Sequence, residues 1–354
     1  MTDPKRPTSA ANAAAGAAAD IPSRDGISAE EARELLDVRG PALYELLLRA
    51  GKTRAHYLGD QSIAFCNIVN AQSGRCPENC AFCAQSSHYK TDSPVYPLMA
   101  LEEILDRARK AKEMGARAFS IVTSGSRLKA GPLLDVCCAA FEWIAANLGL
   151  ECCASLGRAD AEVLGCLKQA GLIRYHHNLE TARSHFPKIC SSYSYDESLA
   201  TLRAAHEAGL EICCGGIFGM GESPAQRVEL AETLRGLRVQ SVPLNLLNPR
   251  PGTPLGDRPL LDPMEALKTI AVFRLMLPDK DILIAGGREV VLRDQQAMLF
   301  LAGVNGLMVG DYLTTANRDW QLDRRMVEDQ GFSLRPPNRT VRGSGEPPAG
   351  PAMS

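Results

Sequence analysis

The sequence predicts an α/β fold, a (β/α)8 barrel of the TIM type preceded by an N-terminal helical extension. Two observations support this prediction. Eight short runs of strand-forming composition occur between residues 63 and 310, and most neighbouring runs are separated by a longer stretch with helical periodicity. Several helical stretches also end in glycine, a common helix C-terminal residue. Eight strands that alternate with helices are typical of a closed parallel barrel.

The predicted elements follow one another in a regular order. A helical extension is expected from Ser28 to Ala50, where Ser28 and Glu31 form a capping-box pattern. The strands are expected at residues 63–69, 116–123, 150–156, 172–179, 210–218, 241–247, 281–287 and 305–310. The helices between them are expected at residues 101–115, 133–149, 160–171, 195–209, 224–236 and 262–276, and four of these end in Gly115, Gly149, Gly171 and Gly209.

Both ends of the chain have the composition of disordered segments. Residues 1–24 are rich in alanine, proline and serine, and residues 333–354 are rich in proline and glycine with almost no large apolar side chain. The sequence between them contains no linker of similar composition. We therefore expect one catalytic domain at residues 25–332 between two disordered ends.

Charge and hydropathy exclude several classes of protein. The 354 residues include 39 Lys and Arg against 41 Asp and Glu, a net charge of −2, so nothing indicates nucleic-acid binding by bulk electrostatics. No unbroken apolar run reaches the about 18 residues that a membrane span requires. The N-terminus does not resemble a signal peptide, which predicts a cytoplasmic protein whose 12 cysteines stay reduced. These cysteines are therefore buried apolar residues or metal ligands.

Most of the unusual polar and sulfur-containing residues follow the predicted strands. In a barrel of this kind, catalytic groups come from the C-terminal ends of the strands and from the loops after them. The sequence therefore predicts one site at that end of the barrel. The segments that fall there are 76–83, 120–124, 152–153, 177–180, 213–222, 245–248 and 286–289.

Three cysteines lie close together in the loop after the first predicted strand. Cys76, Cys80 and Cys83 have the spacing C-x3-C-x2-C, which lets three thiolates reach three irons of a cubane cluster and leaves the fourth iron open. A structural zinc site needs four ligands, usually with a second C-x2-C pair, and the chain has no second pair. Cys66 could be considered as a fourth ligand, but it lies inside the predicted strand.

This loop resembles the cysteine motif of radical S-adenosylmethionine enzymes, with Phe82 as the aromatic residue before the last cysteine. Six segments in order narrow the resemblance to the biotin synthase family, and they extend over residues 60 to 330. They are GRCPENCAFCAQSSHYKT, YHHNLET, GGIFGMGE, SVPLNLLNPRPGTPL, AGGRE and GDYLTT. The resemblance implies a [4Fe–4S] cluster whose open iron binds S-adenosylmethionine and cleaves it to a 5′-deoxyadenosyl radical. It also implies dethiobiotin as the substrate, into which sulfur is inserted between two unactivated carbons. A barrel lumen would shield the radical from solvent.

The resemblance further implies a second, [2Fe–2S] cluster deeper in the barrel, which supplies the sulfur. Position by position, Cys153, Cys213 and Arg288 match three of its ligands, whereas Ser120 stands where the family has a cysteine. Without the resemblance, Arg288 would be interpreted as an anchor for a substrate carboxylate, because a guanidinium stays protonated and only donates hydrogen bonds.

Three interpretations of Ser120 stay open. Ser120 ligates iron directly, a neighbouring Cys152 or Cys214 takes its place, or the second cluster differs. If Cys153 and Cys213 face the lumen, strand alternation turns Cys152 and Cys214 toward the helices. This argument favours Ser120 at or near the cluster.

The remaining predicted contacts lie at the ends of other strands. His176, Asn178 and Glu180 share one strand face and can all point into the lumen. The resemblance implies Asn178 beside cofactor and substrate, and Glu180 at the ribose hydroxyls. His176 and Asn245 are assigned to the substrate, with Asn245 at the ureido ring. The cofactor is also assigned to Phe82 and to the glycine-rich loop through Gly215, Gly216, Gly219 and Glu222.

One position departs from the family pattern. The resemblance implies an arginine after YHHNLET that pairs with the cofactor carboxylate, and Ser198 stands at that position. Arg203 lies about one turn later and is a candidate to compensate.

Two alternatives remain at this point. A radical enzyme similar to methylornithine synthase or to a hydrogenase maturase would lack a competent second cluster, but Cys153, Cys213 and Arg288 together argue against it. A structural iron or zinc protein would need four closed ligands and no glycine-rich cofactor loop. The resemblance also implies a reduced electron donor such as flavodoxin or ferredoxin, and a homodimer. No nucleic-acid or membrane partner is expected.

Overall fold

The computed structural model describes residues 21–59, 61–314 and 318–336. Its centre is a closed barrel of parallel strands, and the last barrel strand pairs again with the first. The predicted (β/α)8 barrel is therefore confirmed. The barrel strands in spatial order are β1 (Ser62–Gln72), β2 (Ala118–Thr123), β3 (Glu151–Ser155), β4 (Arg174–His176), β5 (Glu211–Cys213), β7 (Ser241–Leu246), β8 (Asp281–Ile284) and β9 (Gly306–Met308).

The predicted strand at 210–218 is divided into β5 and a second short strand, β6 (Gly216–Phe218), which pairs with β7. Cys214 and Gly215 lie between them. A Cβ atom on Gly215 would lie 1.9 Å from the Pro243 carbonyl oxygen. The backbone therefore runs too close to β7 at this point to carry a side chain.

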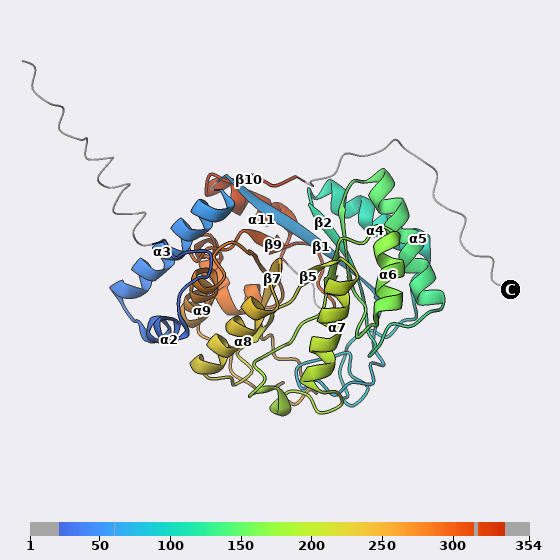
Figure 1. Ribbon diagram of the computed structural model, residues 1–354, viewed down its shortest axis with the longest axis horizontal. Helices are drawn as coiled ribbons and strands as arrows, with labels where there is room; N and C mark the ends of the chain where they lie inside the picture. The colour runs from blue at the N-terminus through green and yellow to red at the C-terminus, as the bar shows by residue number, and fades with distance from the viewer. Residues whose placement is uncertain (1–20, 60, 315–317, 337–354) are drawn as a thin grey trace, which may run out of the picture.

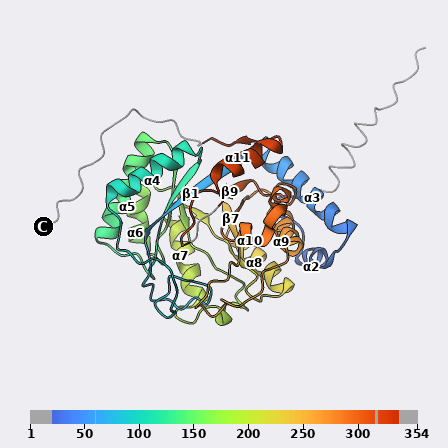
Figure 2. The same ribbon diagram turned by 180° about the vertical axis from the view of Figure 1, so that it is seen from behind.

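Helices surround the barrel. Figure 1 shows α4, α5 and α6 along one side and α2, α3 and α9 along the other, and Figure 2 shows the same arrangement from behind. Helices α4 to α9 lie where the sequence predicts them, whereas α10 and α11 were not predicted. The four predicted terminal glycines have positive φ angles of 80°, 66°, 100° and 74°. The helices are α2 (Ala29–Asp37), α3 (Pro41–Leu58), α4 (Leu101–Glu113), α5 (Pro132–Asn147), α6 (Ala161–Gln169), α7 (Tyr195–Glu207), α8 (Pro224–Gly236), α9 (Pro263–Met276), α10 (Arg288–Leu292) and α11 (Trp320–Asp329), with 3-10 turns η1 (Phe186–Lys188) and η2 (Arg293–Leu299).

The N-terminal extension consists of two helices, α2 and α3, rather than one. Gly40, with φ of 59°, separates them, and Pro41 begins the second helix. The Ser28 hydroxyl accepts a hydrogen bond from the Glu31 N–H (3.1 Å), as the capping pattern predicts. The Glu31 carboxylate pairs with Arg49 of α3 (2.7 Å), so this contact holds the two helices together.

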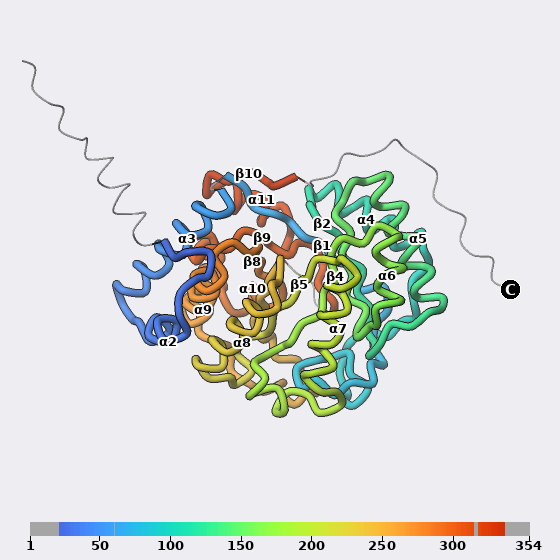
Figure 3. The backbone as a smooth tube through the Cα atoms, viewed as in Figure 1, coloured from blue at the N-terminus to red at the C-terminus, as the bar shows by residue number. Residues whose placement is uncertain are grey.

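The C-terminal part of the described chain requires a correction. Ser333 and Leu334, which the sequence assigns to the disordered tail, form the short strand β10 (Ser333–Leu334) and pair with Ser62 and Ile63 of β1. Figure 3 shows this segment beside β1 at the edge of the barrel. The edge of β1 offers unpaired backbone groups there, which explains why a polar segment adopts a strand. The predictions for residues 1–20 and 337–354 lie outside the described residues.

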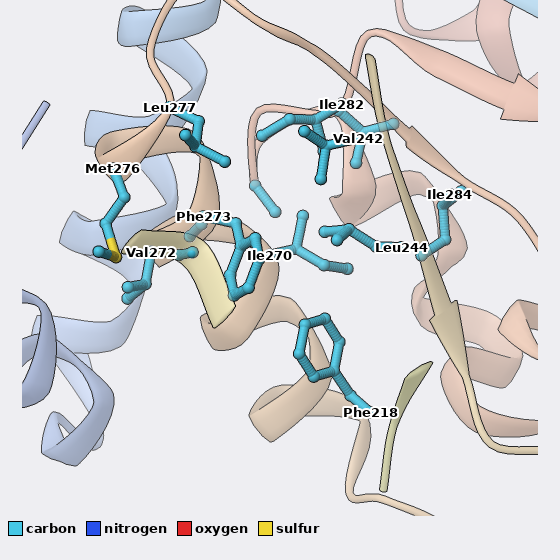
Figure 4. Close-up of a cluster of buried hydrophobic side chains, with 14 of the residues drawn as sticks. Phe218, Val242, Leu244, Ile270, Val272, Phe273, Met276, Leu277, Ile282 and Ile284 are labelled. Carbon is cyan, nitrogen blue, oxygen red and sulfur yellow. The ribbon is translucent and has the colours of Figure 1, made fainter. Parts of the chain in front are cut away.

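Apolar side chains fill the space between barrel and helices. Figure 4 shows part of this core, in which Phe218, Val242 and Leu244 from the sheet meet Phe273 from α9. The rings of Phe218 and Phe273 pack edge to face with centroids 5.1 Å apart. Because successive side chains on a strand alternate, the other face of each strand is turned to the lumen. Within the described residues, no helix combines the length and apolar composition needed to cross a bilayer.

Candidate active site

The cysteine loop, residues 76–83, follows β1 at the C-terminal end of the barrel. The Cys83 N–H donates to the Cys80 carbonyl (3.0 Å), which tightens the loop. The Ala81 N–H donates to the Ile189 carbonyl (2.8 Å), so the segment after β4 holds the loop from outside. Burial, the largest cause, and the neighbouring Cys76 thiol raise the pKa of the Cys83 thiol to about 11. The three predicted ligands thus lie in one compact loop.

A further cysteine, Cys190, lies against this loop. Its Sγ atom is 3.7 Å from the Cys80 Sγ and 3.4 Å from Asn79 Oδ1. The hydrogen bond from Cys80 is the largest cause that lowers the pKa of the Cys190 thiol to about 6, and it raises the pKa of Cys80. No ligand spacing in the sequence includes Cys190, so only the fold brings it here.

Three more thiols face the barrel lumen, and we call Cys66, Cys153 and Cys213 the lumen thiols. They come from β1, β3 and β5 and line one space, the lumen cavity, together with Ser120 of β2. Ser120 is the direct neighbour of Cys153 in the sheet register. Burial raises the pKa of Cys66 and of Cys213 to about 12, and the Cys153 thiol contributes to both shifts. The three thiols line one cavity, so we treat them as one group.

Cys152 and Cys214 lie on the opposite face of their strands. Both are buried in the apolar core between barrel and helices. The predicted orientation of Cys152 and Cys214 is therefore confirmed.

An arginine does lie in the lumen cavity, but it is Arg174 of β4. Its Nη1 points toward Cys153 Sγ at 3.9 Å, and its Nη2 pairs with Glu211 at 2.5 Å. His176, two residues later, has its Nδ1 3.3 Å from Cys213 Sγ. Burial lowers the pKa of His176 to about 4, so this ring is neutral at pH 7. The lumen thiols are thus flanked by one cation and one neutral imidazole.

Arg288, which the resemblance assigns to the second cluster, lies elsewhere. It is the first residue of α10, is completely buried, and does not belong to the lining of the lumen cavity. Its guanidinium donates to Gln296 and forms a buried ion pair with Asp323 of α11. The left-handed turn at Gly287 (φ 80°) starts α10 and directs Arg288 toward α11. The assignment of Arg288 as a cluster ligand is therefore corrected.

Asn178 and Glu180 line the lumen cavity together with His176, as their strand parity predicts. Glu180 has a positive φ of 64°, and its carbonyl accepts from the Ile217 N–H (2.8 Å). Burial raises the pKa of the Glu180 carboxyl to about 7, and its Oε2 is buried without a hydrogen-bond partner. A buried acceptor of this kind is suited to a hydroxyl donor from a ligand.

The glycine-rich loop has a more structural role than the sequence predicts. A Cβ on Gly216 would lie 2.7 Å from the Glu180 carbonyl oxygen, so this glycine permits the close approach of the Glu180 turn. Gly219 has a φ of 96° and requires the left-handed conformation. Glu222 accepts from the N–H groups of Gly219 and Met220 and from Arg227, and it does not belong to the lining of the lumen cavity. Glu222 therefore shapes the loop, and its assignment to the cofactor stays a prediction.

Above the lumen cavity lies a second space, the mouth cavity. Phe82, Ile217, Asn245, Tyr312 and Leu313 line both cavities. The Asn245 Oδ1 accepts from the Tyr312 hydroxyl and from the Gly286 N–H, at 2.9 Å each. Both lone pairs of that oxygen are thus occupied. One Nδ2 hydrogen donates to the Gly216 carbonyl (3.4 Å), which leaves the second Nδ2 hydrogen for a ligand. Tyr312 belongs to the GDYLTT segment, and its position in that segment does not indicate this contact.

The position of the expected carboxylate-binding arginine holds a neutral residue. Ser198 is completely buried on α7, and its hydroxyl has no hydrogen-bond partner. Arg203 on the same helix is exposed to solvent. Cys66 lies within a predicted strand, a position that argues against a ligand of the cysteine loop, yet it lines the lumen cavity. The alternation of side chains along β1 is the sequence signal that indicates a lumen-facing thiol at Cys66.

Comparison with known families identifies two regions. Residues 72–234 match the Radical SAM superfamily, and residues 243–333 match the Biotin and Thiamin Synthesis associated domain. Together these matches cover the barrel from the end of β1 to β10.

Curated relatives are similar over most of the chain. The biotin synthase of Geobacter sulfurreducens is 51% identical over 306 residues, which cover 86% of this chain and 93% of that protein. The biotin synthase of Anaeromyxobacter dehalogenans is 51% identical over 319 residues, which cover 90% of this chain and 88% of that one.

Solved structures share the fold at lower identity. Methylornithine synthase superposes with a TM-score of 0.75 at 20% identity, over 89% of this chain and 95% of that one. The [FeFe]-hydrogenase maturase HydG of Carboxydothermus hydrogenoformans superposes with a TM-score of 0.74 at 18% identity, over 91% and 78% of the two chains.

Proposed function

Since this chain belongs to the biotin synthase family of radical S-adenosylmethionine enzymes, we propose that it inserts sulfur between two unactivated carbons of dethiobiotin to form biotin. When bound, a [4Fe–4S] cluster with S-adenosylmethionine supplies an adenosyl radical, and a second iron–sulfur cluster supplies the sulfur atom. The residues of this chain bind and orient these groups and exclude water from them.

The cysteine loop would hold the first cluster. Cys76, Cys80 and Cys83 supply three thiolates from a backbone that is hydrogen-bonded to the segment after β4. Phe82 lines both cavities and supplies an apolar surface between loop and lumen. A three-thiolate set leaves one iron for the cofactor.

The cofactor would lie between this loop and the strand ends. Glu180, with its unpartnered buried oxygen, accepts hydrogen bonds from the ribose hydroxyls in this proposal. Asn178 also lines the lumen cavity, and its Oδ1 accepts from the Gly215 N–H (3.0 Å), which fixes its side chain. Gly215, Gly216 and Gly219 shape the adjacent loop without side chains that would fill it.

The lumen thiols would hold the second, sulfur-supplying cluster. Cys66, Cys153 and Cys213 are three thiols on one cavity, and Ser120 lies beside Cys153. In this proposed ligand set, Cys66 takes the place of Arg288, which the resemblance implies. Arg288 points away from the lumen toward Asp323, whereas Cys66 lines the lumen cavity. Arg174 adds a positive charge that offsets the charge of thiolates at this depth.

The substrate would bind between the two clusters. Asn245 Nδ2 donates to the ureido carbonyl, because its oxygen is already filled by Tyr312 and Gly286. His176 lies nearby as a neutral ring beside Cys213. The closed barrel keeps water from a reactive carbon radical.

One observation carries this proposal: a group of thiols in the lumen beneath a separate three-cysteine loop. A methylornithine-synthase-like or hydrogenase-maturase-like reaction needs the loop but gives no reason for the lumen thiols. A reduced donor such as flavodoxin or ferredoxin, a homodimer and a cytoplasmic location are further parts of the proposal. They follow from family membership alone.

The test is anaerobic reconstitution of the full chain, with iron and sulfide analysis, Mössbauer spectroscopy and turnover of dethiobiotin. We expect two distinguishable clusters and biotin as the product. Cys153→Ala should lower iron and sulfide while the loop cluster stays, whereas the matched control Cys152→Ala, on the other face of β3, should keep both clusters. Iron for one cluster only, unchanged by Cys153→Ala and without biotin, would overturn the proposal.

A further inference from the structure

We propose that Arg158 binds the carboxylate of S-adenosylmethionine, an inference that rests on the function proposed above. The methionine part of this cofactor carries a carboxylate. A carboxylate placed beside several thiolates needs a cation that offsets the added negative charge. Arg158 is buried against the cysteine loop, where such a cation is required.

The backbone at Arg158 is fixed on both sides. The preceding Gly157 has a φ of 83°, and a Cβ there would lie 2.9 Å from the Ser126 carbonyl oxygen. The Arg158 N–H donates to the same oxygen (2.9 Å), and its carbonyl accepts from the Leu128 N–H (2.8 Å). A side chain on such a backbone loses little conformational entropy when it binds a ligand.

The guanidinium is attached to the cysteine loop itself. Its Nη2 donates to Glu78 Oε1 (2.8 Å), and Glu78 lies between Cys76 and Cys80 in the sequence. The guanidinium carbon is 4.6 Å from the centre of the Tyr193 ring, and the Tyr193 hydroxyl is 3.9 Å from Cys80 Sγ. Arg158 therefore stacks on a ring that contacts one of the loop thiols.

One donor of this buried guanidinium has no hydrogen-bond acceptor. The Arg158 Nε is buried without a hydrogen-bond partner. Glu197 Oε1 forms an ion pair with it at 3.6 Å, which is beyond hydrogen-bond distance, and the Glu197 side chain is partly exposed to solvent. A buried N–H of this kind favours an acceptor from a ligand. Glu78 does not move to fill this place, because its second oxygen accepts from the Ser192 hydroxyl (2.5 Å). Glu78 is thus a positioning residue, and Arg158 is the binding residue.

Other arginines are less suited to the role. Arg203 is exposed on α7, and Arg183 is held at the surface by Asp196. Arg174 lies among the lumen thiols and pairs with Glu211. Ser198, on the helix that begins beside Tyr193, is neutral.

The test compares two ligands on the anaerobically reconstituted full chain without reductant. One ligand is S-adenosylmethionine, and the other is its decarboxylated analogue, which keeps the adenosyl and amino groups. Equilibrium dialysis gives both dissociation constants, and iron content gives the cluster occupancy of each variant. Arg158→Gln should weaken binding of S-adenosylmethionine about 10- to 100-fold, as expected for loss of a charge-assisted hydrogen bond, and should leave the analogue nearly unchanged. Arg158→Lys should lie between, because lysine keeps the charge but not the planar fork.

The matched control is Arg107→Gln on α4, which removes an exposed positive charge and should change neither constant. The inference is overturned if Arg158→Gln weakens both ligands equally or neither. If Arg158→Gln loses iron, the two dissociation constants are compared for Arg158→Lys instead. The inference is also overturned if the iron-depleted variant still prefers S-adenosylmethionine to the analogue as strongly as the wild-type chain does. A wild-type chain that binds neither ligand refutes the proposed function instead, so the two failures are distinguishable.

Discussion

The cysteine loop and the lumen thiols are two groups of three thiols that the chain builds in different ways. The loop places Cys76, Cys80 and Cys83 within eight residues, and local backbone hydrogen bonds set its shape. The lumen thiols come from three strands that are far apart in sequence and meet only when the barrel closes. A local site can therefore be recognised by spacing, whereas a site made by a sheet is recognised by register and side-chain alternation.

The largest effect should follow from a change in the loop. Cys83→Ala should abolish both 5′-deoxyadenosine and biotin formation, because the first cluster loses one of three ligands. Product analysis by chromatography, with iron content, measures this. Cys138→Ala, a cysteine packed on α5 outside both groups, is the control and should keep both products. Formation of 5′-deoxyadenosine by the Cys83 variant would show that the loop is not the radical-generating site.

A change in the lumen should separate the two products. Cys66→Ala should keep 5′-deoxyadenosine formation but lose most biotin and part of the iron, because only the second cluster loses a ligand. Cys214→Ala, which removes an outward-facing thiol, should keep both products apart from a modest loss of stability. Full biotin yield from the Cys66 variant would show that Cys66 is not a ligand of the second cluster.

A substitution of Arg288 tests whether this residue belongs to the ligands of the second cluster. Arg288→Met should lower the free energy of unfolding by about 3–5 kcal/mol, because it leaves the buried Asp323 without its partner. The lumen cluster should keep its iron. Thermal unfolding under anaerobic conditions measures the effect, and Arg324→Met, from an exposed pair with Glu328, should cost less than about 1 kcal/mol. Loss of cluster iron without loss of stability would return Arg288 to the ligand set.

Glu180 should give the smallest effect. Burial raises its pKa to about 7, so the carboxyl is mostly protonated at pH 6 and mostly ionised at pH 8. The ionised form accepts two hydroxyls, and S-adenosylmethionine should therefore bind roughly three- to tenfold more tightly at pH 8 than at pH 6. Glu180→Gln should show no such dependence. A flat profile for the wild-type chain, or a slope that the variant keeps, would contradict this assignment.

Sequence reasoning recovered the barrel because alternating strand and helix patterns are local and regular. It placed Ser120, Cys153 and Cys213 on the lumen correctly, since parity along a strand determines the face. It failed at Arg288 because a motif does not reveal that the turn at Gly287 sends the next side chain toward α11. Burial or metal binding was expected for all cysteines of a cytoplasmic protein, but Cys166 is exposed on α6. Arg158 and Cys190 approach the loop from segments after β3 and β4, and no spacing connects them to it.

The pairing of β1 with β9 and β10 has a consequence for how the protein matures. β1 carries Cys66 and leads into the cysteine loop, yet its edge is covered only by residues 306–308 and 333–334. A ribosome must therefore release nearly the whole chain before the ring of strands can close. Until then, Cys66 and the cysteine loop, which are synthesised first, remain accessible to the proteins that deliver iron and sulfide. We therefore expect iron and sulfide to reach the lumen most readily before the barrel closes.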